Sequence, residues 1–240
     1  MIGLGTIINT GAILLGGLIG LFCRKALKES VQNTLIMACG LCSMFLGIGG
    51  TLEEMLTIEN GKLNSQGALM MVICLALGSL LGELLDIERR FEQFGVWLKQ
   101  KTKNENNKTF VDAFVTASLT TCIGAMAIVG AIQDGIFGDY TILATKAVLD
   151  LVIILIMTAS MGIGCIFAAI PVAVFQGVIT LLARLIEPLM TEQALSNLSL
   201  TGSMLIFCVG VNLVWGKKIK VANMLPSVIF AVIWAFLPFA

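Results

Sequence analysis

Residues 145–187 read TKAVLDLVIILIMTASMGIGCIFAAIPVAVFQGVITLLARLIE, and this stretch decides how often the chain crosses a membrane. A transmembrane helix needs about 20 predominantly apolar residues. The quoted run is about twice that length, and no charged loop divides it. Gly162-Ile-Gly164-Cys165 lies near its middle, and Pro171 suits the first turn of a following helix. We therefore predict a reversal at this glycine pair and two spans.

The whole chain shares this apolar character. Of its 240 residues, 58% are hydrophobic and 12% are charged, and the mean hydropathy is +0.97. Soluble domains carry about 25% charged residues, so this chain has too little charge to cover a globule of its size. Its net charge is zero. The composition predicts an integral membrane protein and excludes a disordered chain, an ordinary cytosolic enzyme and a nucleic-acid partner.

On both sides of the quoted stretch the sequence contains further apolar runs, and together they predict an all-α, polytopic bundle of about eight transmembrane helices. We treat residues 1–240 as a single membrane domain. Its parts are three spans in 1–86, a cytoplasmic amphipathic helix and linker in 87–109, and five spans in 110–240. The predicted spans are 4–22, 33–52, 67–86, 110–130, 145–162, 168–187, 199–216 and 221–238.

Loop charges test this count independently. Twelve of the fifteen basic residues fall in the first, third and seventh loops, whereas the second, fourth and sixth loops are acidic. Cytoplasmic loops carry an excess of Lys and Arg, so we expect the odd loops in the cytoplasm and both termini outside. The twelve are Arg24, Lys25, Lys28, Arg89, Arg90, Lys99, Lys101, Lys103, Lys108, Lys217, Lys218 and Lys220.

The third loop contains an amphipathic segment. Phe91, Phe94, Trp97 and Leu98 fall on one face of a helix whose other face is charged. A helix lying at the inner membrane surface explains this pattern. A gate lever or a docking surface for a partner is the alternative.

Residue types argue against catalysis. The chain has no histidine, and its seven cysteines lie mostly in apolar stretches, which predicts free thiols. Neither a cluster with metal-ligand spacing nor a serine or cysteine with an evident base partner is present in the sequence. We expect no enzymatic activity, no catalytic residue, no metal and no cofactor.

Two segments of the sequence read alike, one from Leu35 to Gly49 and the other from Leu198 to Asn212. Each contains paired glycines, and each follows a polar stretch with a glutamate. Their spans would cross in opposite directions, which predicts an inverted repeat of spans 1–3 and 6–8, a feature of secondary transporters. Small-residue packing is the alternative source of the likeness. Further likenesses link spans 2, 4 and 5, and no single repeat accommodates them all.

Lys146 and Asp150 are the sharpest candidates for a functional pair. They lie four residues apart, on one face of a helix. An ionisable residue inside a membrane is a functional-site hypothesis, here with Asp150 binding a cation and Lys146 as its switchable counter-charge. The alternative is a structural pair with Lys146 reaching outward to the interface.

Five uncharged polar residues lie in or beside the spans, and each must find a partner because an unsatisfied amide is costly in hydrocarbon. They either hold helices together or line a polar path for a solute or ion. In the last span a proline at 226 also frees backbone carbonyls. The five are Asn9, Gln133, Gln176, Asn212 and Asn223.

With these residues assembled, the chain resembles the bacterial inner-membrane family catalogued as domain of unknown function 554 (YqgA/YdfK type). The likeness rests on the stretches 78–88 (GSLLGELLDIE), 127–135 (AIVGAIQDG), 145–150 (TKAVLD), 170–177 (IPVAVFQG) and 220–226 (KVANMLP). The resemblance implies a bacterial cytoplasmic membrane. It supplies no catalytic or binding roles.

Three functions fit these features. The leading hypothesis is a transporter of a small solute or ion that works by alternating access. It is supported by the inverted repeat, the glycine-broken spans 4 to 6 and the charged pair, because discontinuous helices in paired positions are typical of transporters. An ion channel is the second. The third is a structural or regulatory membrane subunit that docks through residues 87–100. Expected partners are the lipid bilayer, a small solute or ion and, as a further hypothesis, a second copy of the chain.

Overall fold

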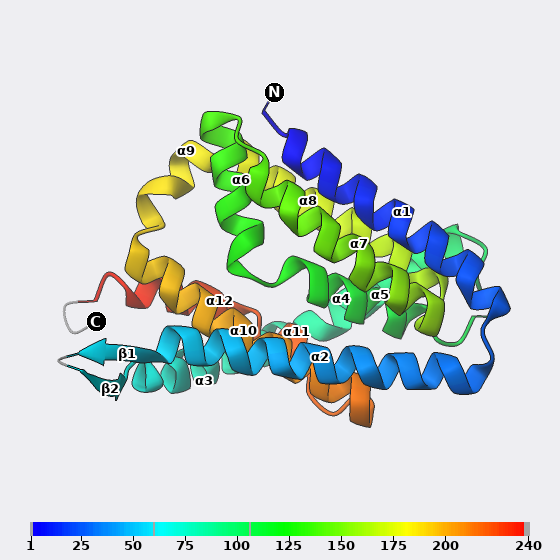
Figure 1. The fold of residues 1–240 in the computed structure, drawn as a ribbon, viewed down its shortest axis with the longest axis horizontal. Helices are drawn as coiled ribbons and strands as arrows, with labels where there is room; N and C mark the ends of the chain where they lie inside the picture. The colour runs from blue at the N-terminus through cyan, green and yellow to red at the C-terminus, as the bar shows by residue number, and fades with distance from the viewer. Residues whose placement is uncertain (1, 60, 106, 238–240) are drawn as a thin grey trace.

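The structure is a computed structural model that describes residues 2–59, 61–105 and 107–237. Helices make up nearly all of the described chain, which confirms the predicted helical bundle (Figure 1). The longer helices are α1 (Leu4–Ala26), α2 (Glu29–Met55), α3 (Ala68–Leu85), α4 (Ile87–Lys101), α5 (Phe110–Cys122), α6 (Ala125–Phe137), α7 (Thr141–Met161), α8 (Ala169–Leu181) and α10 (Glu192–Trp215). The shorter ones are η1 (Ile163–Ala168), α9 (Ala183–Ile186), η2 (Glu187–Leu189), α11 (Val221–Met224) and α12 (Pro226–Trp234).

A small hairpin is an addition to the predicted helices. Its strands are β1 (Leu56–Glu59) and β2 (Lys62–Ser65), which pair antiparallel with Leu56 opposite Ser65. The hairpin connects α2 to α3 at one end of the bundle (Figure 1).

Six helical segments of the described chain are long and apolar enough to cross a membrane. A seventh crossing follows if α5 and α6, which meet at an angle of 61°, are counted as one broken span. The predicted eighth span corresponds to α11 and α12, an apolar stretch over Val221–Trp234 that is shorter than the others. The number of full-length spans is therefore six or seven, and the last predicted span is present as a short, interrupted helix.

The predicted reversal after α7 is confirmed. Gly162 ends the helix with φ 104°, a left-handed value that favours glycine, and η1 begins at the next residue. The Thr6 and Thr180 hydroxyls meet between α1 and α8, and a Cβ at Gly17 would touch Ile166. Because the residue numbers run in opposite senses, α8 is antiparallel to α1.

Glycines allow α1 to lie directly against α7, and the two helices run in parallel (Figure 1). A Cβ built on Gly5 would lie 2.7 Å from the Leu143 side chain. One built on Gly16 would lie 2.4 Å from the Leu151 carbonyl oxygen. These two backbones are therefore closer than any side chain other than hydrogen would permit.

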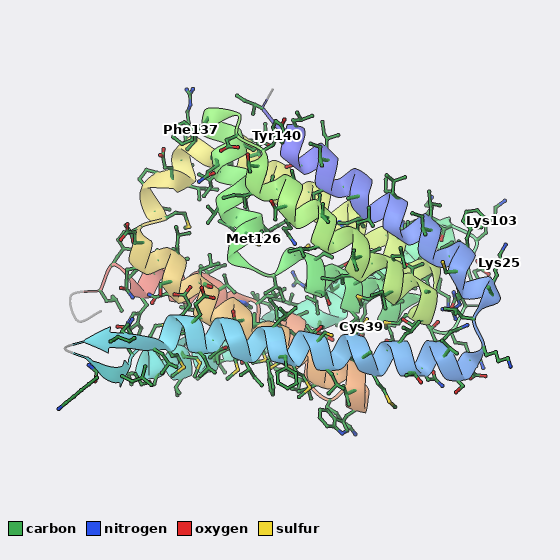
Figure 2. All side chains as sticks on the ribbon, viewed as in Figure 1. Lys25, Cys39, Lys103, Met126, Phe137 and Tyr140 are labelled. Atoms are coloured by element: carbon green, nitrogen blue, oxygen red, sulfur yellow. The ribbon has the colours of Figure 1, made fainter. Side chains whose placement is uncertain are left out.

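The charges of the loops divide the bundle into two ends. Figure 2 shows Lys25 and Lys103 close together at one end, on the right, and Phe137 and Tyr140 at the top of the view. The Arg24 guanidinium donates to the Ser160 carbonyl at the end of α7 with an N–O distance of 2.9 Å, so the first loop meets the turn at Gly162. We call this the basic end and the opposite one, with the hairpin and the start of α7, the acidic end.

Large apolar side chains cover much of the outer surface of the bundle. Helix α2 has only three buried residues, all of them small, because its larger side chains point outward. A soluble domain does not leave such a continuous apolar surface in water. This surface is suited to lipid, and the chain is a multi-pass membrane protein. Examples are Leu15, Phe22, Phe45, Leu46, Leu69, Leu80, Leu84, Val148, Val174 and Leu181.

Candidate functional site

A buried ion pair lies in the first half of α7. Lys146 Nζ is 2.9 Å from Asp150 Oδ1, and the two residues are 7% and 3% exposed. Their spacing of four residues places them on the same side of the helix, one turn apart. Taking both charges out of water costs several kcal/mol per ion, so such a pair needs further polar partners.

Asn9 and Gln176 lie at about the depth of Asp150, Asn9 on α1, which packs against α7, and Gln176 on α8, which packs against α1. Asn9 on α1 is fully buried and lies beside the Asp150 carboxylate. Gln176 on α8 is 1% exposed and lies one helical turn from Thr180, which contacts α1.

The apolar residues below them fix the register of the three helices. Ile13, Ile154 and Val172 belong to one buried cluster between α1, α7 and α8. They lie four residues from Asn9, Asp150 and Gln176 in their respective helices, toward the basic end in each case. Asn9, Asp150 and Gln176 therefore form one level across three helices, which we call the polar layer.

Several atoms of the polar layer have no hydrogen-bond partner within the described residues. Asn9 faces Asp150, but neither atom of its amide completes a hydrogen bond. Buried polar groups are normally satisfied, and each that is not costs about 1–3 kcal/mol. The atoms are Asn9 Nδ2 and Oδ1, Asp150 Oδ2, and Gln176 Nε2 and Oε1.

The break between α5 and α6 lies next to the ion pair. Cys122, the last residue of α5, is within electrostatic reach of both Lys146 and Asp150. Gly124 follows with φ 139°, which lets the chain turn by 61° before α6. Figure 2 shows Met126 at this bend. The carboxyl end of α5, where a helix presents unpaired carbonyls and partial negative charge, thus ends inside the bundle beside the polar layer.

A cavity of about 190 Å³ opens at the basic end. Asp112, Asn212 and Lys217 are among the polar residues that line it, and Leu119 and Val209 are among its apolar wall. Leu119 is three residues before Cys122 on α5, so the cavity reaches to within about one helical turn of the break.

The acidic end is closed by direct contacts. The Gly5 amide, in the first turn of α1, donates to Asp134 Oδ2 on α6 with an N–O distance of 2.9 Å. The hydroxyls of Thr6 and Thr180 are 3.4 Å apart, one level above the polar layer. A Cβ at Gly135 would lie 2.4 Å from the Thr180 carbonyl.

The residue on α6 that faces the interior is Asp134, which is fully buried. The sequence analysis selected its neighbour Gln133, which is half-buried and lies at the level of the first turn of α1, not in the polar layer. Consecutive helical residues point about a third of a turn apart, so only the packing of α6 against α1 distinguishes the two.

Asn212 and Asn223 lie far from the polar layer, at the basic end. Asn212 accepts hydrogen bonds from the Lys218 and Ile219 amides, both at 2.9 Å, and thereby holds the loop after α10. Asn223 accepts from the Glu88 amide and donates to Glu83, both at 2.6 Å. Asn212 thus ties the seventh loop to the end of α10, and Asn223 ties α11 to α3 and α4.

Lysines of the seventh loop complete this cluster. Lys217 Nζ is 2.9 Å from Glu88 Oε1 and also contacts Glu92. Partial burial lowers the pKa of Lys217, but hydrogen bonds to Glu92 and Glu88 outweigh that effect and raise the pKa above its ordinary value. A hydrogen bond to Glu83 likewise raises the pKa of Lys220. Both lysines are therefore held charged beside the mouth of the cavity.

The predicted amphipathic helix is α4, and its apolar face packs against the bundle. The Phe91 ring stacks on Phe114 of α5 with centroids 5.8 Å apart, and Leu98 is buried. Trp97 remains half exposed on the same helix. Much of the apolar face thus serves as a contact to α5, while Trp97 is free to reach the membrane interface.

Comparisons with known proteins identify the family. The sequence profile of a family described as "Protein of unknown function (DUF554)" matches residues 4–236. An "Uncharacterized membrane protein YdfK" from Bacillus subtilis (strain 168) is 30% identical over 225 residues, covering 94% of this chain and 92% of the relative. An "Uncharacterized protein YqgA" from Escherichia coli (strain K12) is 28% identical over 232 residues, covering 95% and 94%. No solved structure matches the chain.

Proposed function

The chain belongs to the DUF554 family, whose description assigns no activity, and we propose that it is a transporter of a small solute or ion that works by alternating access. The observation that carries this proposal is the cavity at the basic end, which leads toward a broken helix and a buried ion pair. In transporters the substrate site lies near the middle of the membrane, at discontinuous helices.

The closed acidic end and the open basic end correspond to one of the two states that alternating access requires. By the positive-inside rule the basic end faces the cytoplasm, so the state described is open to the inside. Opening to the outside would separate the first turn of α1 from Asp134 and Thr6 from Thr180. Each contact is a single polar interaction, which a gate can break and form again.

The packing of the helices supports an inverted repeat of spans 1–3 and 6–8. The proposed counterparts contact one another antiparallel in all three cases, α1 with α8, α2 with α10 and α3 with α12. For α3 and α12, Gly78 lies against Ser227 and Gly82 against Asn223. An axis in the membrane plane relates such pairs in secondary transporters.

The two middle spans fit the same symmetry. α7 packs in parallel with α1. The broken span α5–α6 packs in parallel with η1 and α8, since Gly164 lies against the Phe110 carbonyl and Gly135 against that of Thr180. Each proposed three-span unit therefore has one parallel neighbour, α7 for the first and α5–α6 for the second.

Charge movement in proteoliposomes tests the proposal. The reconstituted protein is exposed to rapid exchange from choline chloride into sodium chloride, potassium chloride or mixtures of neutral and zwitterionic metabolites. We expect a transient current with at least one of these probes, and we expect Asp150→Asn to abolish it. The matched control is Asp139→Asn, which changes an exposed carboxylate at the start of α7 and keeps an amide oxygen that can cap the helix.

Two results would contradict transport. One is that the intact, folded protein gives no transient current with any probe, and the other is that the intact protein and Asp150→Asn give equal currents. A channel is distinguished by its rate and by the absence of counterflow, because a channel conducts without a site that opens alternately. A much faster flux that no unlabelled solute stimulates from the opposite side would therefore favour the channel.

A further inference from the structure

The polar layer presents three oxygen atoms at one depth from three different helices. They are Asp150 Oδ2, Asn9 Oδ1 and Gln176 Oε1, and all three lack a hydrogen-bond partner within the described residues. The three side chains are at least 97% buried, so bulk water does not satisfy them. Three unsatisfied oxygens buried at one depth below the closed end are unfavourable unless something binds there.

The chemistry of these atoms selects the class of ligand. Carboxylate and amide oxygens are the preferred ligands of hard cations. A proton would neutralise the Asp150 carboxylate alone and would leave the amide oxygens of Asn9 and Gln176 without a partner. A divalent cation normally draws on several carboxylates, and the described residues contain no cluster of three or more acidic, histidine or cysteine side chains. An anion would meet the negative charge of Asp150.

Two further features favour a single positive charge. The carboxyl end of α5 terminates beside Asp150, and the partial negative charge of a helix carboxyl end favours a cation. Lys146 already occupies Asp150 Oδ1 and supplies a counter-charge when the layer is empty. A monovalent cation bound to Oδ2 would compete with Lys146 for the same carboxylate.

The size of the layer is set by glycines. Gly16 brings the α1 backbone against the Leu151 carbonyl of α7, and Gly5 brings it against the Leu143 side chain, so on either side of Asn9 the two helices leave little room. A small ion fits such a layer better than a large one.

We propose that Asn9, Asp150 and Gln176 form a Na⁺ site, in which the ion replaces Lys146 as the partner of Asp150. This site deepens the proposed transport function, for which it supplies the coupling or transported ion. The binding itself is an equilibrium property and is measurable whether or not transport occurs.

Equilibrium binding of radioactive ²²Na⁺ to the detergent-purified full chain tests the site. We expect saturable binding that unlabelled Na⁺ displaces at concentrations where K⁺ and choline do not. Gln176→Leu removes one oxygen and replaces a buried amide by an apolar side chain of similar size, so the variant should fold. Its affinity for Na⁺ should fall about tenfold or more, the loss of one good ligand. Asp150→Asn should abolish binding.

The matched control is Gln193→Leu, which makes the same substitution at an exposed amide on α10. Its affinity should match that of the intact protein. Thermal unfolding of each variant verifies folding, and Na⁺ should raise the apparent stability of the intact protein and of Gln193→Leu, because the ion binds only the native form.

Three results would overturn the Na⁺ site: no saturable binding to the folded intact protein, unchanged affinity in Gln176→Leu, or equal displacement by K⁺ and Na⁺. Failure here and failure of transport are distinguishable. Charge movement without Na⁺ binding overturns the site alone, whereas Na⁺ binding without charge movement or flux supports the site and contradicts the transport function.

Discussion

At the scale of single residues, Gly16 on α1 is the clearest structural determinant. A Cβ there would lie 2.4 Å from the Leu151 carbonyl oxygen, whereas a Cβ at Gly11 would have nothing within 4 Å. The two glycines lie in the same helix, and alanine favours a helix by about 1 kcal/mol over glycine. At Gly16 the contact with α7 therefore opposes the helical preference for alanine, whereas at Gly11 nothing opposes it.

We predict that Gly16→Ala lowers the free energy of unfolding by about 1–3 kcal/mol, the usual cost of overpacking. Gly11→Ala should leave it unchanged or raise it. Thermal unfolding in detergent measures both. A Gly16→Ala protein as stable as Gly11→Ala would mean that α1 and α7 are not in backbone contact.

At the residue scale the sequence indicates which polar side chains lie in the spans, but it does not indicate which groups they contact. The rule that a polar group in a span must find a partner selected Asn9 and Gln176, which the structure brings to the level of Asp150. The same rule selected Asn212 and Asn223, which instead hold backbone amides of loops at the basic end. Which role an amide takes depends on the register between distant helices, and no local pattern carries that register.

At the scale of helices, the contact between α1 and α8 is the closed gate of the proposed transporter. The Thr6 and Thr180 hydroxyls are 3.4 Å apart, close enough for cysteines at both positions to form a disulfide after small adjustments. Ile179, next to Thr180, belongs to a buried apolar cluster with Ile132 and Leu143, so opening this end would also separate apolar side chains.

We predict that a Thr6→Cys/Thr180→Cys protein, in a background without the seven native cysteines, forms a cross-link on mild oxidation. Cross-linking should stop transport, and reduction should restore it, because the acidic end can no longer open. Each single cysteine variant should transport normally under both conditions. Undiminished transport through the fully cross-linked protein would refute a gate between α1 and α8.

The sequence predicted most helices to within a few residues, because apolar runs and charged loops mark their ends. It also placed the reversal at Gly162, where a left-handed φ requires glycine. The expected glycine break in span 4 is present as the bend at Gly124 between α5 and α6, whereas the shortness of α12 was not predicted. The β1–β2 hairpin was likewise missed, since a polar loop of this length can also remain irregular.

At the scale of the whole molecule, the charged loops give the bundle a direction. The basic residues of the first, third and seventh loops gather at one end, and α12 leads from that end toward the acidic one. The first turn of α1 is also at the acidic end. From the positive-inside rule we predict that both termini lie outside the cytoplasm.

We predict that alkaline phosphatase fused to the C-terminus is active in bacterial cells and that a fluorescent protein fused there is dark. A second pair of fusions, made in the 102–109 linker, should give the opposite pattern. Fluorescence from the C-terminal fusion would mean that the membrane orientation is reversed or that the last helix does not cross the membrane.

The most direct measurement of the central claim is the accessibility of the polar layer from each side of the membrane. Asn9→Cys, in the background without native cysteines, is labelled with a small membrane-impermeant thiol reagent in sealed vesicles of both orientations. Alternating access predicts labelling from both sides, with the outer labelling abolished when Thr6→Cys and Thr180→Cys are cross-linked and the inner labelling retained. A cysteine at position 9 that reacts from neither side, or from the outer side despite the cross-link, would contradict the account.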